Sequence, residues 1–445
     1  MEGTGPTKPA TRKTAANGAR GWVDEKRGLV DREAFVSDEV YKLEFERIFD
    51  RTWMYLAHES EIPAPGDYVV RTLGSAPVIV VRAANGAIHA NLNSCRHRGT
   101  KLCRADMGTA AHFVCPYHGW SYEHDGRLIT TTFDRHFPDG TDFSQLHLIA
   151  VPRVESYQGL VFGSWNADVI DLPRHLGQFR SYLDAFFGRT PLGMQVLAPP
   201  HRWRVKANWK VGALNFIGDS QHVVTTHIGP LTLDPLRAAN KGLAKVADES
   251  FQVFTDEGHG CTVSYLPGSV PDGEYQSYTP ELERLYEQTL APAQRELLRR
   301  LRVIVGNVFP NLSFIESQAG PGEKAVILRL WHPISGTEME VLSWVFCERE
   351  ASAGYKERVL RMGYRNFGAA GLFEQDDMEL WASGADASNN RIAKQFPWGF
   401  QTALRFLAKP ESSNKWPGRI YRPADTEAAQ FEFMRHWDKM MRANA

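Results

Sequence analysis

The sequence has few cysteines, almost no net charge and no long apolar run. Five cysteines in 445 residues, an odd number, do not predict a disulfide framework, and they favour a reducing, cytoplasmic environment. The formal net charge is −1, so no overall field argues for binding to nucleic acid or to a membrane surface. No segment approaches the roughly 20 apolar residues that span a bilayer, and none has the apolar core of a signal peptide.

The composition that is present predicts a globular protein with ample core. The 445 residues correspond to about three domain-sized units, or one small and one large domain, and 43% of them are hydrophobic. Residues 1–20 are rich in Thr, Ala, Gly, Pro and Lys/Arg, so we expect a disordered leader there. A helix is expected from Ser37, which suits an N-cap before an apolar pattern of helical period.

Two short loops each contain one cysteine and one histidine. The motifs are C-R-H-R-G, with Cys95 and His97, and C-P-Y-H-G-W, with Cys115 and His118; the seventeen residues 98–114 lie between them. In a Rieske centre two cysteines hold one iron of a [2Fe–2S] cluster and two histidines hold the other. The ligand types and their arrangement therefore favour a Rieske cluster.

A structural zinc site is the chemical alternative for the same four side chains. Zinc fingers usually pair like ligands, C-x₂₋₄-C followed by H-x₃₋₅-H, whereas each loop here pairs a cysteine with a histidine. The remaining cysteines, Cys103, Cys261 and Cys347, fit neither loop, and we expect them to be small buried hydrophobes.

A second group of metal-ligand residues lies in the stretch 208–227, N-W-K-V-G-A-L-N-F-I-G-D-S-Q-H-V-V-T-T-H. Two neutral imidazoles and one carboxylate suit Fe(II) and leave positions open for dioxygen chemistry, and His222 and His227 supply the imidazoles. Asp219 suits a carboxylate that orients His222. In a regular helix a spacing of five separates the two rings, so the β-branched run between them predicts a local loosening or a π-bulge. The third ligand must come from elsewhere.

Together these groups make the sequence similar to a known family. It resembles the large (α) subunit of Rieske non-haem iron aromatic-ring-hydroxylating dioxygenases, the group of naphthalene and biphenyl dioxygenases, from about residue 30 to the end. Both loops match the family's cluster motif, including its spacing. The resemblance implies that Cys95, His97, Cys115 and His118 hold the [2Fe–2S] cluster.

The same resemblance implies a mononuclear Fe(II) site. His222 and His227 match its histidine ligands, Asp219 its bridging carboxylate and Asn215 the asparagine near the iron.

The carboxylate ligand falls in a later stretch, F-G-A-A-G-L-F-E-Q-D-D at 367–377. On residue type alone, Asp376 and Asp377 form an acidic pair between which the sequence does not choose. The family's ligand aligns with the second acid, Asp377. By the same resemblance, four apolar residues line the pocket over the iron: Phe216, Val223, Phe367 and Phe373.

The rest of the chain favours an α+β fold. Asn85-Gly86 and Asp125-Gly126 mark hairpins on either side of the Cys–His loops. A large antiparallel sheet is predicted from long apolar strands at 251–265, 303–316, 324–333 and 338–348. Helices are predicted at 279–302, 355–366, 388–408 and 426–442. The resemblance implies an all-β Rieske domain, 52–170, inserted in an α+β catalytic domain made of 21–51 and 171–445.

The activity that the resemblance implies is reductive use of O₂ to cis-dihydroxylate an aromatic ring, of a hydrocarbon or an aromatic acid, to a cis-dihydrodiol. Electrons from NAD(P)H pass through a reductase, usually with a ferredoxin, to the cluster and then to the mononuclear iron. The implied assembly has three α and three small β subunits. In it His118 of one subunit faces Asp219 and His222 of the next.

Other functions compete with this one. A Rieske-type monooxygenase or demethylase of an aromatic substrate is the closest, because it uses the same two metal groups. A pure electron carrier of Rieske ferredoxin type needs only about 55–165, so the large C-terminal half and the second metal motif count against it. A zinc-stabilised binding protein would be colourless, whereas a Rieske cluster is brown-red.

Overall fold

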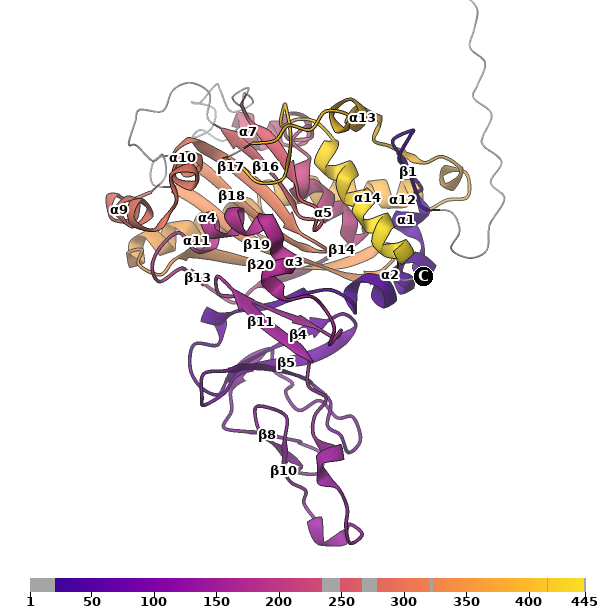
Figure 1. The fold of residues 1–445 in the computed structure, drawn as a ribbon, viewed down its shortest axis with the longest axis vertical. Helices are drawn as coiled ribbons and strands as arrows, with labels where there is room; N and C mark the ends of the chain where they lie inside the picture. Colours follow the sequence, from indigo (N-terminus) through magenta and orange to yellow (C-terminus); the bar gives the residue numbers. More distant parts are fainter. Residues whose placement is uncertain (1–20, 234–248, 266–277, 321–322, 414, 444–445) are drawn as a thin grey trace, which may run out of the picture.

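The computed structural model describes residues 21–233, 249–265, 278–320, 323–413 and 415–443, so the leader expected at 1–20 lies outside the described residues. The chain forms a large mixed part and a smaller, strand-rich part that projects from it (Figure 1). The projecting part has a hydrophobic core of its own, drawn from residues between 79 and 148. That core includes both cysteines of the Cys–His loops, Cys95 and Cys115.

Three small antiparallel sheets build the projecting part and its base. Their strands are β3 (Met54–His58), β4 (Asp67–Leu73), β5 (Ala76–Arg82), β6 (Ile88–Leu92), β7 (Met107–Thr109), β8 (Phe113–Val114), β9 (Ser121–Tyr122), β10 (Leu128–Thr130), β11 (Arg153–Tyr157) and β12 (Leu160–Ser164). The sheet orders are β6-β5-β4-β7, β10-β9-β8 and β11-β12-β3. Both predicted hairpins are present, and their turns use Gly86 and Gly126 at φ values of 85° and 91°, which glycine adopts at no steric cost.

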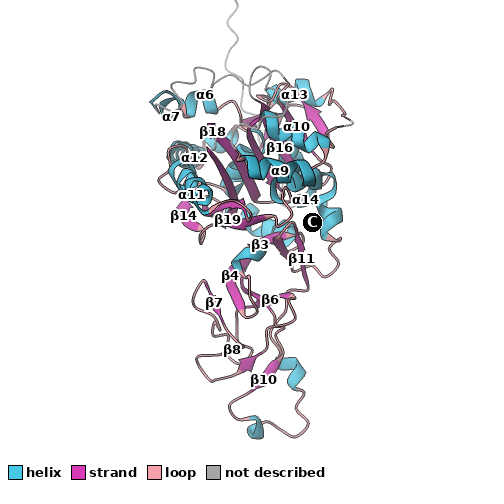
Figure 2. Cartoon of the chain, turned by 90° about the vertical axis from the view of Figure 1, so that its left-hand side faces the viewer, coloured by secondary structure: helices cyan, strands magenta, loops and turns pink. Residues whose placement is uncertain are grey.

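A nine-stranded antiparallel sheet dominates the larger part (Figure 2). Its strands are β13 (Met194–Val196), β14 (His201–Val205), β15 (Phe251–Phe254), β16 (Gly260–Tyr265), β17 (Leu301–Val308), β18 (Leu312–Gly320), β19 (Glu323–Ser335), β20 (Glu338–Glu348) and β22 (Arg419–Tyr421). The order is β13-β20-β19-β18-β17-β16-β15-β22, and β14 also pairs with β20. The predicted large antiparallel sheet is confirmed.

Two of the four predicted strands were wrong in extent, because each is a hairpin. The segment 251–265 turns at Gly258, whose φ is 95°, and becomes β15 and β16. The segment 303–316 is interrupted after Val308 at the cis Phe309-Pro310 bond and continues as β18. An apolar run that is buried on both sides of a turn carries no periodic signal to mark the turn.

Helices cover the sheet and complete the α+β fold. In chain order they are α1 (Glu33–Val36), α2 (Asp38–Glu44), α3 (Leu172–Leu176), α4 (Arg180–Phe187), α5 (Trp209–Gly218), α6 (Val223–Thr226), α7 (Ile228–Leu233), α9 (Pro280–Thr289), α10 (Pro292–Arg300), α11 (Ala353–Phe367), α12 (Glu374–Ser388), α13 (Gln401–Leu407) and α14 (Ala428–Ala443). Ser37 caps α2 as predicted, accepting the N–H of Val40 at 3.4 Å.

The helix predictions need two corrections. The segment 279–302 is two helices, because Pro292 begins α10 and the chain is extended just before it. The segment 388–408 contains a 3₁₀ turn, the two-residue strand β21 (Trp398–Gly399) and the short α13, whereas the long helix α12, at 374–388, was not predicted. The first turn of α12 is E-Q-D-D, and acidic residues without an apolar repeat do not predict a buried helix from sequence.

A buried ion pair holds α5 in place. Lys210 in the first turn of α5 is fully buried, and its Nζ lies 2.5 Å from Oε1 of Glu44 at the end of α2. The indole N–H groups of Trp209 and Trp437 also donate to Glu44, at 2.9 and 2.8 Å. The pair therefore ties α5 to α2 and α14, and α5 packs across strands β16 to β19.

Three neighbouring histidines far from either Cys–His loop make the fold sensitive to acid. His259 is fully buried; its Nε2–H donates to the carbonyl of His175 at 2.8 Å, and its Nδ1 accepts the N–H of Phe309 at 3.0 Å. Both ring nitrogens are thus used by the neutral imidazole. Burial lowers the pKa of His259 to about 4 and the pKa of His436 to about 3, and the pKa of His175 also lies well below its usual value.

We expect stability to fall as the pH drops from about 6.5 toward 4, because the unfolded chain takes up protons at these histidines and the folded chain does not. A histidine lowered from about 6.5 to about 4 contributes roughly 3 kcal/mol that is present above pH 6.5 and lost over this interval. His436→Phe keeps the aromatic contact with Phe309 and removes one titrating group, so the urea midpoint should depend less on pH than in the wild type. An unchanged pH dependence would contradict this account.

Candidate functional site

The stretch predicted to hold two metal ligands folds as a helix, a break and a single helical turn. Helix α5 begins after Asn208, whose side chain accepts the N–H of Lys210 at 3.0 Å, and it ends at Gly218. Asp219 is its C-cap. His222 and His227 then stand at the two ends of the one-turn helix α6. The loosening or π-bulge predicted for the β-branched run is not found: Val223–Thr226 form a regular helical turn, and the helix is instead interrupted before His222 and again at His227.

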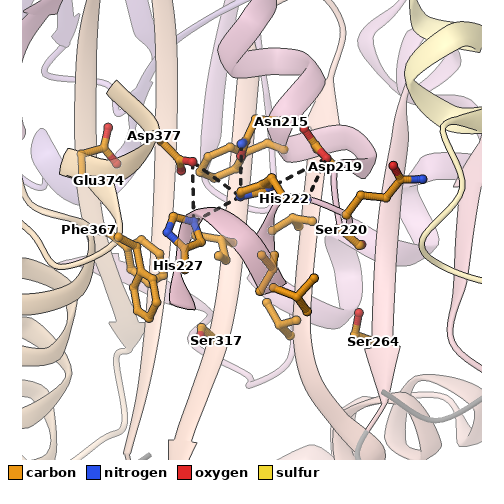
Figure 3. A pocket seen from close by; sticks show the side chains of 18 of the residues that line it. Asn215, Asp219, Ser220, His222, His227, Ser264, Ser317, Phe367, Glu374 and Asp377 are labelled. Atoms are coloured by element: carbon orange, nitrogen blue, oxygen red, sulfur yellow. Dashed lines mark hydrogen bonds and ion pairs between the residues drawn. The ribbon is translucent and has the colours of Figure 1, made fainter. Parts of the chain in front are cut away.

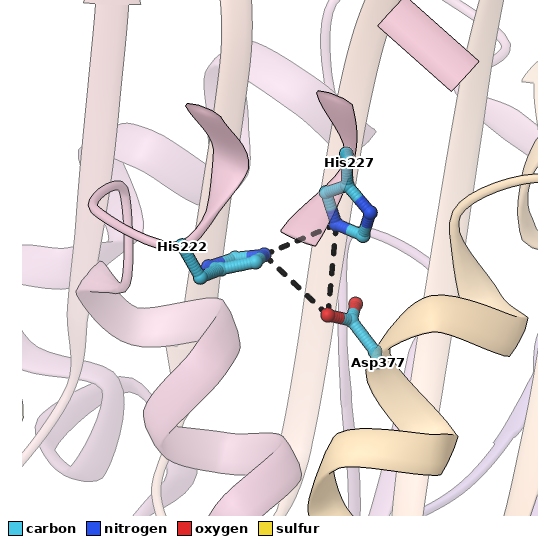
Figure 4. Close-up of side chains that lie close together, drawn as sticks. All are labelled: His222, His227 and Asp377. Atoms are coloured by element: carbon cyan, nitrogen blue, oxygen red, sulfur yellow. Dashed lines mark hydrogen bonds and ion pairs between the residues drawn. The ribbon is translucent and has the colours of Figure 1, made fainter. Parts of the chain in front are cut away.

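The helical turn between them brings both imidazoles to one point, where a carboxylate joins them (Figure 4). Nε2 of His222 lies 3.1 Å from Nε2 of His227, and Oδ1 of Asp377 lies 3.5 Å from each of them. Asp377 comes from the first turn of α12. Within the described residues this is the one group of three such side chains whose ligand atoms all lie within 4.8 Å of one another.

The two adjacent acids take different positions. Asp377 is buried and faces both Nε2 atoms, whereas Oδ2 of Asp376 lies 3.2 Å from Nδ1 of His227. On the other histidine, Oδ1 of Asp219 lies 3.5 Å from Nδ1 of His222. Each imidazole thus presents Nε2 to the centre and Nδ1 to a carboxylate, which is how a metal-binding histidine is oriented. This arrangement separates Asp376 from Asp377, which the residue types could not.

The electrostatics of this group suit a cation. Burial raises the pKa of Asp377 to about 7. Burial by itself lowers the pKa of His222, but hydrogen bonding to Asp219 and the charge of Asp377 outweigh it and raise that pKa. The carboxylate of Asp377 is buried and faces two imidazole nitrogens, and a divalent metal ion held between these three groups would balance its negative charge. Two histidines and one carboxylate are the donor set of non-haem Fe(II) oxygenases.

A cavity of about 270 Å³ lies beside these side chains (Figure 3). The four residues predicted as pocket walls all line it: Phe216, Val223, Phe367 and Phe373. So does Asn215, whose amide nitrogen lies 3.4 Å from Nε2 of His222. The sheet adds Val303, Val305 and Ile315 to the apolar wall, and the remaining lining is mainly polar or charged: Asp219, Ser220, Gln221, Ser264, Arg302, Ser317, Arg329, Glu374 and Asp425.

Sequence reasoning missed a buried ion pair at the cavity wall. Arg329 on β19 and Glu374 in α12 are each 1% exposed and pair through Nη1 and Oε2. The Nη2 group of Arg329 donates to the carbonyl of Phe367 at 2.9 Å. These contacts fix the segment between α11 and α12, and with it Phe373 and Asp377. From the sequence, Arg329 is a charged residue within an apolar strand, and nothing in the sequence indicates that Glu374 is its partner.

The two Cys–His loops fold in the same way. In each, the glycine four residues after the cysteine has positive φ, 75° at Gly99 and 71° at Gly119, and donates its N–H to the carbonyl of the cysteine. The loops close from opposite sides, so that Nδ1 of His97 lies 3.1 Å from Nδ1 of His118. The structure therefore brings the two predicted histidines together.

In these loops the cysteines are buried and the histidines are partly exposed, as expected for a cluster with one iron held by cysteines and the other by histidines. Cys95 and Cys115 are 3% and 2% exposed, and burial raises the pKa of the Cys95 thiol, whereas both histidines are partly exposed. The ring of Trp120 stacks on His97 with centroids 4.8 Å apart. Tyr122, not singled out from the sequence, places its hydroxyl 3.3 Å from Sγ of Cys95. Buried sulfur and outer imidazole ligands fit a Rieske [2Fe–2S] cluster.

Comparison with known proteins defines the class of protein. Residues 52–141 match the model for the Rieske [2Fe-2S] domain, and residues 185–443 match the model for the ring hydroxylating alpha subunit (catalytic domain). The chain therefore belongs to the ring-hydroxylating dioxygenase α-subunit family, whose catalytic domain binds a mononuclear iron. It is an oxidoreductase, and members of the family are α subunits of multi-subunit oxygenases.

Individual relatives are similar to this protein over almost the whole chain. The α subunit of N,N-dimethyl phenylurea N-demethylase from Sphingobium sp. strain YBL2 is 33% identical and covers 94% of this chain and 92% of its own. The α subunit of biphenyl dioxygenase from Paraburkholderia xenovorans LB400 is 32% identical, with coverage of 95% and 93%. Naphthalene 1,2-dioxygenase from Rhodococcus sp., solved with bound indole, has a TM-score of 0.87 at 36% identity and covers 93% and 94% of the two chains.

These matches confirm the expected fold class and exclude a lone Rieske electron carrier. Among the described residues no helix combines the length and apolar character needed to cross a membrane.

Proposed function

We propose that this chain is the terminal oxygenase component that cis-dihydroxylates an aromatic ring with O₂ and with electrons that originate from NAD(P)H. The observation that carries the proposal is the meeting of His222, His227 and Asp377 at the edge of an apolar cavity. The family's named members support the choice of substrate, since they include dioxygenases of biphenyl, chlorobenzene and benzene.

Each residue of the site has a role in this proposal. His222, His227 and Asp377 hold the iron, which when bound supplies the activation of dioxygen. Asp219 and Asp376 hold the two imidazoles through their Nδ1 atoms, so that both Nε2 atoms face the centre.

The cavity itself selects an aromatic substrate. Phenylalanine rings at 216, 367 and 373 form an apolar wall that excludes water and leaves room for a flat ring. A cavity of about 150 Å³ accepts benzene. The 270 Å³ here therefore suits a bicyclic or substituted arene.

We also propose the domain division and the assembly that the resemblance implied. A Rieske domain at about 52–170 would sit in a catalytic domain formed by the rest of the chain, in an α₃β₃ complex supplied by a ferredoxin and a reductase. The Cys–His loops, close to β8, lie at the far end of the molecule from α7 in both views (Figures 1 and 2). That separation favours a path in which the partner subunit's His118 approaches Asp219.

The cluster ligands can be tested with two buried cysteines of this chain. Cys115→Ser should lose the brown-red visible spectrum, about two irons per chain and the acid-labile sulfide, because a serine oxygen is a poor ligand for this iron. Cys103→Ser is the matched control: Cys103 is 8% exposed and lies outside both loops, so the spectrum should stay. Colourless wild-type protein that contains zinc would support the structural zinc site instead.

A second candidate is oxidative demethylation, which the demethylase among the relatives favours. One experiment separates the two. The oxygenase is reconstituted with NADH, a reductase and a ferredoxin, and incubated with arenes, benzoates and N-methylated anilides under ¹⁸O₂. Two labelled oxygen atoms in a dihydrodiol support ring dihydroxylation. Formaldehyde and a demethylated product, without dihydrodiol, would overturn it in favour of demethylation.

A further inference from the structure

The linker between α11 and α12, residues 368–373, carries a cavity wall and leads to the proposed iron ligand Asp377, but it has little packing of its own. Its sequence is G-A-A-G-L-F, so before Phe373 it has only one side chain larger than a methyl group, and that side chain, Leu372, is 39% exposed. The N–H groups of Leu372 and Phe373 donate to carbonyls at the end of α11, at 2.9 and 3.1 Å. These bonds tie the linker to α11 but not to the sheet.

Arg329 ties both ends of this linker to the sheet. It lies on β19, an inner strand that pairs with β18 on one side and with β20 on the other. Its Nη2 group donates to the carbonyl of Phe367, the last residue of α11, at 2.9 Å, and its Nη1 group pairs with Oε2 of Glu374, the first residue of α12. Glu374 and Asp377 are three residues apart on this helix, so their side chains are neighbours on its surface. The guanidinium therefore sets where the first turn of α12, and with it Asp377, lies against the sheet.

The same guanidinium also packs against two walls of the cavity. Its Cζ atom lies 5.2 Å from the ring centroid of Phe216, on α5, and 5.9 Å from that of Phe367. Both rings line the cavity, as do Arg329 and Glu374 themselves. A substrate ring that rests on these two phenylalanines is thus placed by the same side chain that places Asp377.

Stability alone does not account for a charged pair at this place. Arg329 and Glu374 are each 1% exposed, yet Nε of Arg329 and Oε1 of Glu374 have no hydrogen-bond partner among the described residues. A buried ion pair whose polar atoms are incompletely bonded adds little stability, and apolar residues of similar volume often replace such a pair without loss. Its position between the cavity walls and Asp377 points instead to a role in holding these parts in one geometry.

We propose that Arg329, acting through Glu374 and Phe367, is a positioning residue for ring dihydroxylation, which keeps the substrate ring and the iron ligand Asp377 at a fixed separation. This inference rests on the proposed function and adds a residue to it. A misplacement of about 1 Å can slow a reaction about 100-fold. When the ring is misplaced, the electrons of NADH and two protons reduce O₂ to hydrogen peroxide instead of entering the product.

The double variant Arg329→Met/Glu374→Leu tests this role, because it removes both charges and nearly preserves the volume. Its urea midpoint and iron content should stay near wild type. With naphthalene and the reconstituted electron chain, kcat for product should fall about 100-fold, whereas NADH oxidation falls much less and hydrogen peroxide accounts for the difference. The electron paramagnetic resonance spectrum of the ferrous site with nitric oxide and naphthalene should split into several species, because the ring no longer has one position. A stable, iron-loaded double variant that couples NADH to product as well as wild type would overturn the proposal.

Arg329→Lys is the second variant, and it decides the question if the double variant does not fold. Lysine keeps the charge but has one nitrogen in place of the two that hold Glu374 and Phe367, so peroxide should rise relative to product. Arg71→Lys is the matched control: Arg71 is also buried, pairs with Glu61, donates to a backbone carbonyl and lies over an indole ring, but it is outside the cavity lining. It should keep the coupling of wild type.

Equal coupling in the two lysine variants would contradict a role for Arg329 in positioning. The proposed function is judged separately, by the product of the wild type. If the wild type yields a demethylated product, and peroxide still rises in Arg329→Lys but not in Arg71→Lys, the positioning role stands and ring dihydroxylation fails.

Discussion

Replacing Asp377 with asparagine is expected to remove the mononuclear iron and with it product formation, while the Rieske cluster stays loaded. Asparagine keeps the shape of the side chain but not its charge, and Asp377 is the buried anion that faces both Nε2 atoms. Iron content should fall from about three to about two atoms per chain with an unchanged visible spectrum. Product should fall to below about one hundredth of wild type, since changes behind the ligands already cost about 10- to 100-fold.

The neighbouring acid provides the control for this prediction. Asp376→Asn leaves the three proposed ligands in place and weakens only the contact with Nδ1 of His227. It should therefore retain iron and lose about 10- to 100-fold in activity at most. If Asp376→Asn loses the iron and Asp377→Asn keeps it, the assignment of the ligand is reversed. If excess Fe(II) partly restores product formation in Asp377→Asn, the substitution has lowered the affinity of the site for iron.

The sequence predicted those metal-ligand residues that lie close together along the chain. Cysteine and histidine at a fixed spacing specify two loops, and the pair His222 and His227 lies within one short segment, so residue type and spacing carry the information. It was also foreseeable that one regular helix would not carry both histidines, since a spacing of five does not bring their rings together. The form of the distortion was not foreseeable, because the β-branched run forms the helical turn α6 and the helix is interrupted on both sides of it.

The parts that could not be predicted depend on contacts between distant segments. Helix α12 has no strong apolar repeat, and it is held at the site by the pairing of Glu374 with Arg329 of β19. That pairing also sets the rotation of α12 about its axis. Successive residues of a helix point about 100° apart, so this rotation decides whether Asp376 or Asp377 faces the two Nε2 atoms. Which residues of β17 face the cavity, Val303 and Val305 among them, depends on the strand register, and alternation of residue types did not resolve that register in these continuous apolar strands.

The second large effect is expected for Asp219→Asn. The carboxylate of Asp219 lies 3.5 Å from Nδ1 of His222, on the side away from the two facing Nε2 atoms, and is partly exposed. It is therefore placed to meet a second imidazole, which in the proposed assembly is the partner subunit's His118. A carboxylate between two imidazoles fixes both rings and couples proton position to redox state, and asparagine, being uncharged, cannot do the latter.

Both metals should therefore load in Asp219→Asn, while product formation slows by about 100-fold or more. The decisive measurement is a single turnover: the chemically reduced cluster is mixed with O₂ and an arene, and its reoxidation is followed by visible absorbance. Slow reoxidation with full metal content assigns Asp219 to the link between the two metal groups, whereas fast reoxidation with full metals rejects it. Loss of iron would instead make Asp219 only a support for His222. Asp425→Asn changes another acid of the cavity lining and, because its exposed carboxylate contacts neither histidine within the described residues, should reoxidise at the wild-type rate.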